Sequence, residues 1–171
     1  MTQPAERIIE IDGLPKVPLH IVLVEPEIPP NTGNVARLCA ATGAALHLVE
    51  PLGFRIDDRS LKRAGLDYWK RLNVVIHASI EEFLATPLAA RMWLLSTRAQ
   101  RRYDRASYSF GDALLFGKET KGLPAALLER FPERSLRIPM REDSVRSINL
   151  STAVGIVTYA ALSTLEFPNL H

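Results

Sequence analysis

The sequence predicts an α/β fold in which a mainly parallel sheet is flanked by helices. Short, continuous apolar runs alternate along the chain with segments of helical periodicity, which is the pattern of parallel strands joined by helices. The 171 residues are 47% hydrophobic and 23% charged, as in an ordinary folded domain. We therefore expect one domain over residues 19–171, preceded by an extension over residues 1–18.

The first half of the chain contains the clearest strand and helix signals. Leu19–Val24 is a continuous apolar run, typical of a buried strand. Asn31 or Thr32 is expected to cap a helix over Asn34–Thr42, and Gly43 stands where a helix end favours a positive φ. Further strands are expected at Leu46–Val49 and Val74–His77, and further helices at Ser60–Leu66 and Ile80–Ala85.

The second half repeats the alternation. We expect an arginine-rich loop after the first of its strands, and a helix from Pro124 to Arg130, because proline is favoured in the first turn of a helix. The expected strands are Met92–Ser96, Ala113–Phe116 and Leu136–Ile138.

The last predicted helix, from Asn149 to Leu165, is apolar on nearly all sides. The segment between Arg146 and Glu166 carries no charge and is about long enough for a membrane span. Its asparagine, serine, threonine and tyrosine side chains are too polar for lipid, so we expect no membrane association. We interpret it as a helix buried on more than one face, which in so small a domain indicates that a partner subunit covers part of it.

The cysteine and the histidines limit the kinds of site that the sequence predicts. Cys39 is the one cysteine and falls on an apolar helix face, so the sequence excludes a disulfide scaffold and indicates a reducing compartment. Without an apolar signal segment near the N-terminus, a cytoplasmic location is expected. No metal site is predicted, because the histidines are widely separated and each is expected to be a satisfied, partly buried side chain. They are His20, His47, His77 and His171.

Common nucleotide-binding motifs are absent from the sequence. No G-x-G occurs, which excludes the dinucleotide fingerprint. Gly117 and Lys118 resemble the end of a P-loop, but Asp112 stands where its first glycine belongs. Glu119 stands where a magnesium-binding hydroxyl belongs, so this is not a Walker motif.

Basic residues gather in two clusters, although the formal net charge is only +2. Such clusters are either solvated faces or surfaces for RNA phosphates, to which arginine is well suited. Both interpretations stay open on composition alone. One cluster runs from Arg55 to Arg71, and the other contains Arg98, Arg101, Arg102 and Arg105, with Tyr103 and Tyr108 nearby.

Three polar loops follow predicted strands, at residues 25–37, 116–124 and 138–151. In a parallel sheet the carboxyl ends of the strands share one edge, where ligands bind. Taken singly, each loop is explained by turn and helix-capping chemistry. In chain order they contain NTGNVARLCAATG, FGKETKGLP and IPMREDSVRSINLSTAV.

This succession of motifs resembles the SPOUT class of RNA methyltransferases, and within it the bacterial tRNA (cytidine/uridine-2′-O)-methyltransferases of the wobble nucleotide. The EPLGF segment at residues 50–54 also fits, and the similarity runs from Leu19 to Phe167. The resemblance implies a C-terminal deep trefoil knot, an obligate homodimer, S-adenosylmethionine as cofactor and tRNA as substrate. Knots are rare exceptions to ordinary topology, so periodicity alone does not predict one.

The resemblance also implies a cofactor site at strand ends. Gly117 would let the backbone approach the ligand because it has no Cβ, and apolar side chains would wall the adenine. The implied cofactor-binding residues are Leu95, Gly117, Ile138, Met140 and Ser147.

Arg37 is the catalytic residue to which the resemblance points first. The reaction would move a methyl group from a sulfonium to a ribose 2′-hydroxyl. Because arginine is always protonated, Arg37 would hold the adjoining phosphate and stabilise charge on the 2′-oxygen. Asn31 and Glu119 would orient Arg37 or the substrate, and Asn149 and Tyr159 complete the implied set.

The implied substrate is an anticodon loop, since RNA is read specifically mostly in single strands. Leucine tRNAs are the expected substrates, with Arg63, Arg101, Arg102 and Arg146 as RNA contacts. Val145 lengthens the third loop relative to the family pattern. Two alternatives stay open: a SPOUT methyltransferase of another tRNA or ribosomal RNA site, and a non-catalytic dimeric RNA-binding module.

Overall fold

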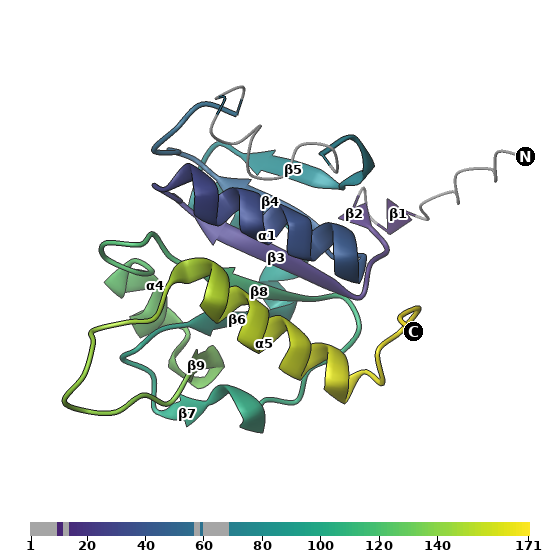
Figure 1. Cartoon of the computed structure of the whole chain (residues 1–171). Helices are drawn as coiled ribbons and strands as arrows, with labels where there is room; N and C mark the ends of the chain where they lie inside the picture. Colours follow the sequence, from purple (N-terminus) through teal and green to yellow (C-terminus); the bar gives the residue numbers. More distant parts are fainter. Residues whose placement is uncertain (1–9, 12–13, 57–58, 60–68) are drawn as a thin grey trace, which may run out of the picture.

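The computed structural model describes residues 10–11, 14–56, 59 and 69–171 (Figure 1). Within these ranges, seven parallel strands form one sheet in the order β5-β4-β3-β8-β6-β9-β7. This confirms the predicted parallel α/β architecture. The strands are β3 (Leu19–Val24), β4 (Ala45–Val49), β5 (Val74–His77), β6 (Met92–Leu95), β7 (Arg101–Arg102), β8 (Asp112–Phe116) and β9 (Ser135–Arg137).

Helices cover both faces of this sheet, and a small antiparallel hairpin of β1 (Glu10–Ile11) and β2 (Leu14–Pro15) precedes it. The helix expected at Ser60–Leu66 lies outside the described residues. The α-helices are α1 (Pro29–Thr42), α3 (Ile80–Leu84), α4 (Ala125–Arg130) and α5 (Leu150–Thr164), and the 3-10 turns are η1 (Trp69–Arg71), η2 (Pro87–Arg91), η3 (Tyr103–Arg105) and η4 (Pro132–Arg134).

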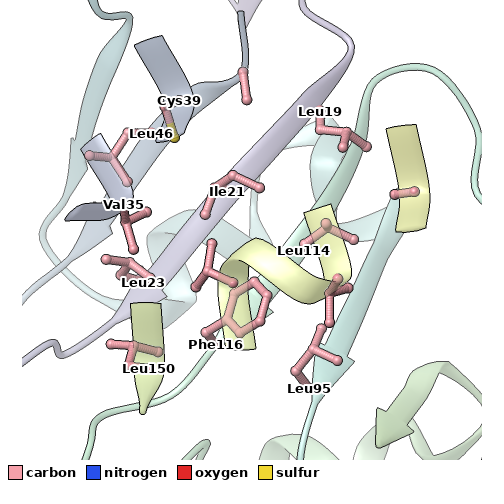
Figure 2. Close-up of a cluster of buried hydrophobic side chains, with 14 of the residues drawn as sticks. Leu19, Ile21, Leu23, Val35, Cys39, Leu46, Leu95, Leu114, Phe116 and Leu150 are labelled. Carbon is pink, nitrogen blue, oxygen red and sulfur yellow. The ribbon is translucent and has the colours of Figure 1, made fainter. Parts of the chain in front are cut away.

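The residues of β3 alternate between two apolar cores, because successive side chains of a strand point to opposite faces. Leu19, Ile21 and Leu23 pack in one core with residues of α1 and α5, and Figure 2 shows Leu23 next to Leu150 of α5. The intervening residues face the other core, which contains parts of α3 and α4. All six residues of β3 are buried, as expected for a parallel sheet covered on both sides.

Helix α1 begins at Pro29, so the prediction that Asn31 or Thr32 caps a helix from Asn34 is wrong. Both residues lie inside the first turn and are buried. The two prolines at residues 29 and 30 occupy the first helical positions, where a missing N–H costs nothing. The expected C-cap is confirmed, because Gly43 has a φ of 73°.

Strand β7 was not expected, because its two residues fall within the segment predicted as an arginine-rich loop. Arg101 and Arg102 pair with Leu136 and Arg137 of β9. The last strand in the chain therefore lies between β6 and β7 rather than at the edge of the sheet. The C-terminal knot stays a prediction.

Helix α5 follows a long polar segment and is capped by Asn149, whose side chain accepts a hydrogen bond from the backbone N–H of Thr152. It packs against α1 (Figure 1), with one side turned into the core. Across the described part of the chain, no helix combines the length and apolar character that a bilayer crossing requires.

Candidate active site

The three motif loops meet at the carboxyl edge of the sheet. The first joins β3 to α1, the second follows β8, and the third leads from β9 into α5. Because β8 pairs directly with both β3 and β6, and β6 pairs with β9, the loops leave adjacent parts of the same edge. The carboxyl edge of the sheet, where ligands of parallel sheets bind, is therefore the place where the motifs converge.

A line of three polar side chains joins these loops. Asn31 donates from Nδ2 to Oε1 of Glu119 at 3.0 Å, and Asn149 donates from Nδ2 to Oδ1 of Asn31 at 3.0 Å. Asn31 is only 6% exposed, so its amide is held by both partners away from solvent. We call Glu119, Asn31 and Asn149 the amide line.

Glu119 also supplies the cap that α1 does not carry itself. Its carboxylate accepts from the backbone N–H of Glu27 at 2.8 Å and from that of Ile28 at 3.1 Å. Ile28 is the N-cap residue and has no side-chain oxygen. A carboxylate at this end satisfies backbone donors and also interacts favourably with the helix dipole.

A second set of bonds joins acidic side chains of the first motif loop to residues of the second. The Glu27 carboxylate accepts from the backbone N–H of Thr120 at 3.1 Å and from its hydroxyl at 2.9 Å. Lys118 donates from Nζ to Glu25 at 2.6 Å, and this bond raises the pKa of Lys118. We call these bonds, together with those from Glu119 to the backbone of residues 27 and 28, the loop clamp. Charges of opposite sign in two motifs were visible in the sequence, but their pairing was not.

The second loop is closed so tightly that residue 117 has to be glycine. A Cβ on Gly117 would lie 1.9 Å from the backbone carbon of Gly122 and 2.1 Å from the nitrogen of Leu123. Gly122 itself has a φ of 68°, and its N–H donates to the carbonyl of Lys118 at 2.8 Å. No side chain fits between these backbones, so glycine at position 117 is required for the closure of the loop itself.

The implied cofactor residues follow neighbouring strands. Leu95 pairs with Phe116 in β8 and with Leu136 in β9, so the chain continues from the same level of the sheet into Gly117 and Ile138. Leu95 is buried, and Ile138 and Met140 are half-buried. This arrangement of apolar walls around a glycine backbone fits an adenosine group. Ser147 is exposed in the segment that precedes α5.

Two further predicted catalytic residues lie on α1 and α5. Arg37 lies on the exposed side of α1. Tyr159 is 47% exposed and contacts Phe167, with ring centroids 6.4 Å apart. At 1.5 Å per residue it lies ~15 Å along α5 from Asn149. The roles of Arg37 and Tyr159 stay predictions.

Two of the predicted RNA-binding arginines have partners in their own chain. Arg102 makes two hydrogen bonds to the carboxylate of Asp104, at 2.9 and 2.6 Å. Arg101 lies over the ring of Trp93 at 5.3 Å and donates to the carbonyl of Arg105. Arg146 is exposed, and Arg63 lies outside the described residues.

Three of the four histidines form a buried row across β3, β4 and β5. Nδ1 of His20 lies 2.9 Å from Nε2 of His47, and Nδ1 of His47 lies 2.9 Å from Nε2 of His77. Burial lowers the pKa of His20 to about 4 and that of His47 to about 3, and it also lowers the pKa of His77. The expectation of satisfied histidines is confirmed for this histidine row, whereas His171 is exposed.

Cys39 is a core residue rather than a reactive thiol. Cys39 is 1% exposed, and burial raises its pKa to about 12, so its thiol stays protonated and packs in the core as expected. Among the residues that the structure describes, no three side chains of the ligating types are grouped to hold a metal ion.

Comparison with known proteins identifies the motifs further. The model of the SpoU rRNA Methylase family matches residues 18–159. A tRNA (cytidine(34)-2′-O)-methyltransferase of Burkholderia cenocepacia (strain HI2424) is 53% identical over 145 residues, which are 83% of this chain and 92% of the relative.

Solved structures of RNA methyltransferases are also similar to this chain. One that describes structural insights into the 2′-OH methylation of C/U34 on tRNA is 49% identical, with a TM-score of 0.81, and the match covers 86% of this chain and 96% of that chain. An AdoMet-bound rRNA methyltransferase from Sinorhizobium meliloti is 26% identical, with a TM-score of 0.76, over 86% of this chain and 56% of that chain.

Proposed function

The chain belongs to the SpoU rRNA methylase family, and from that premise we propose that it methylates the wobble nucleotide of tRNA. It transfers a methyl group from S-adenosylmethionine to the ribose 2′-hydroxyl of cytidine or uridine at position 34. The observation that carries this proposal is the amide line, which unites the three motif loops at one edge of the sheet. Leucine tRNAs are the proposed substrates.

The cofactor supplies an activated methyl group on its sulfonium. The residues present fit it: the tightly closed loop at Gly117 follows β8, and Leu95, Ile138 and Met140 would supply apolar walls at the adjacent strand ends. Ser147 adds a hydroxyl from the segment before α5.

Arg37 is proposed to act on the substrate phosphate and on the 2′-oxygen. A ribose hydroxyl is a poor nucleophile and loses its proton on attack, so a positive charge held nearby lowers the barrier. The amide line and the loop clamp hold the first turn of α1, from which the helix carries Arg37. Fixed geometry of this kind supplies a large share of such a barrier.

We further propose a homodimer that acts in the cytoplasm. Tyr159 and Phe167 are 47% and 40% exposed on and just after α5, and a second subunit would cover them. Both subunits would then build the tRNA surface with Arg63 and Arg146. Arg101 and Arg102, which are tied to their own chain, would shape that surface at the sheet edge.

The test is methyl transfer from labelled S-adenosylmethionine to leucine tRNA that lacks wobble methylation. We expect label in this tRNA and none in the same RNA with a 2′-deoxy wobble nucleotide. Label in both would move the target to another RNA site, and failure to bind the cofactor would favour a non-catalytic RNA-binding module.

Arg37→Ala separates catalysis from folding in the same assay. We expect methyl transfer to fall about 100-fold or more, because charge stabilisation at the reacting oxygen is lost. Cofactor affinity and the unfolding midpoint should stay as in the unaltered protein. Full activity in this variant would refute the role assigned to Arg37.

A further inference from the structure

A cavity of about 890 Å³ opens at the carboxyl ends of β4 and β5, beside the site described above. Its volume lies in the range of small-molecule sites. None of the implied catalytic or cofactor residues lines it. The lining residues are Glu50, Pro51, Leu52, Phe54, Arg55, Ile56 and Ala78.

The loop that forms this cavity packs directly on the first motif loop. The N–H of Gly53 donates to the carbonyl of Pro26 at 2.9 Å, and that of Glu25 donates to Val49 at 2.9 Å. A Cβ on Gly53 would lie 2.7 Å from the Cα of Glu27, so the two backbones are in contact. Residues 25–28 therefore separate the cavity from the second motif loop, to which the loop clamp binds them.

The lining combines one aromatic ring, apolar walls, the carboxylate of Glu50 and the guanidinium of Arg55. Half-buried Phe54 offers a face on which any base stacks, which is how proteins hold single-stranded nucleotides. The exposed carboxylate of Glu50 attracts N–H donors, which a nucleobase offers and a phosphate does not. Among the parts of a nucleotide, the base meets both demands.

We propose that this cavity receives the pyrimidine base of the nucleotide that is methylated, with Phe54 stacking on the ring and Glu50 accepting from the exocyclic amino group of cytosine. Carboxylates bind the N4 amino group of cytosine in this way in other nucleic-acid complexes. Uracil carries a carbonyl oxygen at that position, so the cavity favours cytidine. This inference rests on the proposed function and adds to it a preference for cytidine over uridine at the methylated position.

The experiment compares two tRNAs that differ only in cytidine or uridine at position 34. We expect Glu50→Gln to lower the ratio of kcat/KM for the cytidine over the uridine substrate about tenfold, because the second carboxylate oxygen and the charge are lost. Phe54→Ala should lower kcat/KM for both substrates about tenfold through KM, and Phe54→Trp should keep it. Cofactor affinity and unfolding midpoints should match the unaltered protein.

The matched controls are Glu81→Gln on α3 and Phe110→Ala before β8, both exposed and away from this cavity, which should leave every value unchanged. An unchanged substrate ratio in Glu50→Gln would overturn the role of Glu50, and Phe54→Ala behaving as Phe110→Ala would overturn the stacking site. If the unaltered protein methylates neither tRNA, the proposed function fails. Fluorescence titration with cytidine- and uridine-containing anticodon oligonucleotides then decides the base site alone.

Discussion

Two lines of three polar side chains cross this molecule, and they differ in what they connect. The amide line joins residues 88 and 118 positions apart in the sequence, whereas the histidine row joins residues 27 and 30 positions apart on neighbouring strands. The first lies at the sheet edge and includes a carboxylate. The second is buried beside Phe83 and is held neutral.

The difference shows how burial determines the role of a set of hydrogen-bonded polar side chains. At the edge, the carboxylate of Glu119 accepts from one amide and two backbone N–H groups and so orients them around the proposed reaction site. Inside the sheet a charge is too costly, so the imidazoles only satisfy one another. Disruption of the amide line should therefore reduce activity, and disruption of the histidine row should reduce stability.

The largest effect is expected for Glu119→Ala. Removal of the carboxylate frees Asn31 and the first turn of α1, and we expect kcat/KM to fall about 100-fold, because small misplacements of reacting groups cost this much. Steady-state methyl transfer measures it, with Glu129→Ala on α4 as the exposed control. A fall in the free energy of unfolding as large as that expected for His47→Ala would contradict the distinction between the amide line and the histidine row.

A smaller effect, on stability rather than activity, is expected for His47→Ala. The change leaves ring nitrogens of His20 and His77 without a partner and opens a cavity, so the free energy of unfolding should fall by about 2 kcal/mol. Urea unfolding measures this against His171→Ala. The kcat/KM of the folded protein should stay within about twofold, and a much larger drop would link the row to the site.

The smallest effect is a dependence of stability on pH. Unfolded histidine takes up a proton near pH 6.5, whereas burial, and for His20 also the charge of Arg91, delays uptake in the folded state to about pH 4. The unfolded state thus binds more protons in this window, and each of the buried histidines should lower the free energy of unfolding by about 1 kcal/mol per pH unit below 6.5. Urea titrations should show a shallower slope for His47→Gln. Equal slopes would contradict the assignment.

Most of the fold followed from local patterns. The bounds of β3 and β5 and the turn at Gly43 are as predicted, because buried strands and a left-handed helix end leave direct traces in the sequence. The start of α1 did not, since Pro29 and Pro30 resemble a turn until the helix they open is seen. Strand β7 is two residues long and takes its conformation from β9.

The sequence motifs named three residues of the candidate site, but they did not predict the hydrogen bonds that join them. The motifs named Asn31, Glu119 and Asn149, and their union depends on sheet order that no local pattern contains. The loop clamp was missed because its partners come from separate motifs. The histidine row was missed for a similar reason: which side chains of three strands stand abreast depends on register, and the register is visible only once the strands are paired.

The histidine row has one more property, which concerns direction. Each neutral imidazole carries one hydrogen, so His47 has to donate with one nitrogen and accept with the other. If it donates to His77, then His20 donates to it; if it donates to His20, then His77 donates to it. The three tautomers are therefore coupled. The row has two possible hydrogen-bond directions, and a change from one to the other exchanges the donor and acceptor nitrogens of all three side chains together.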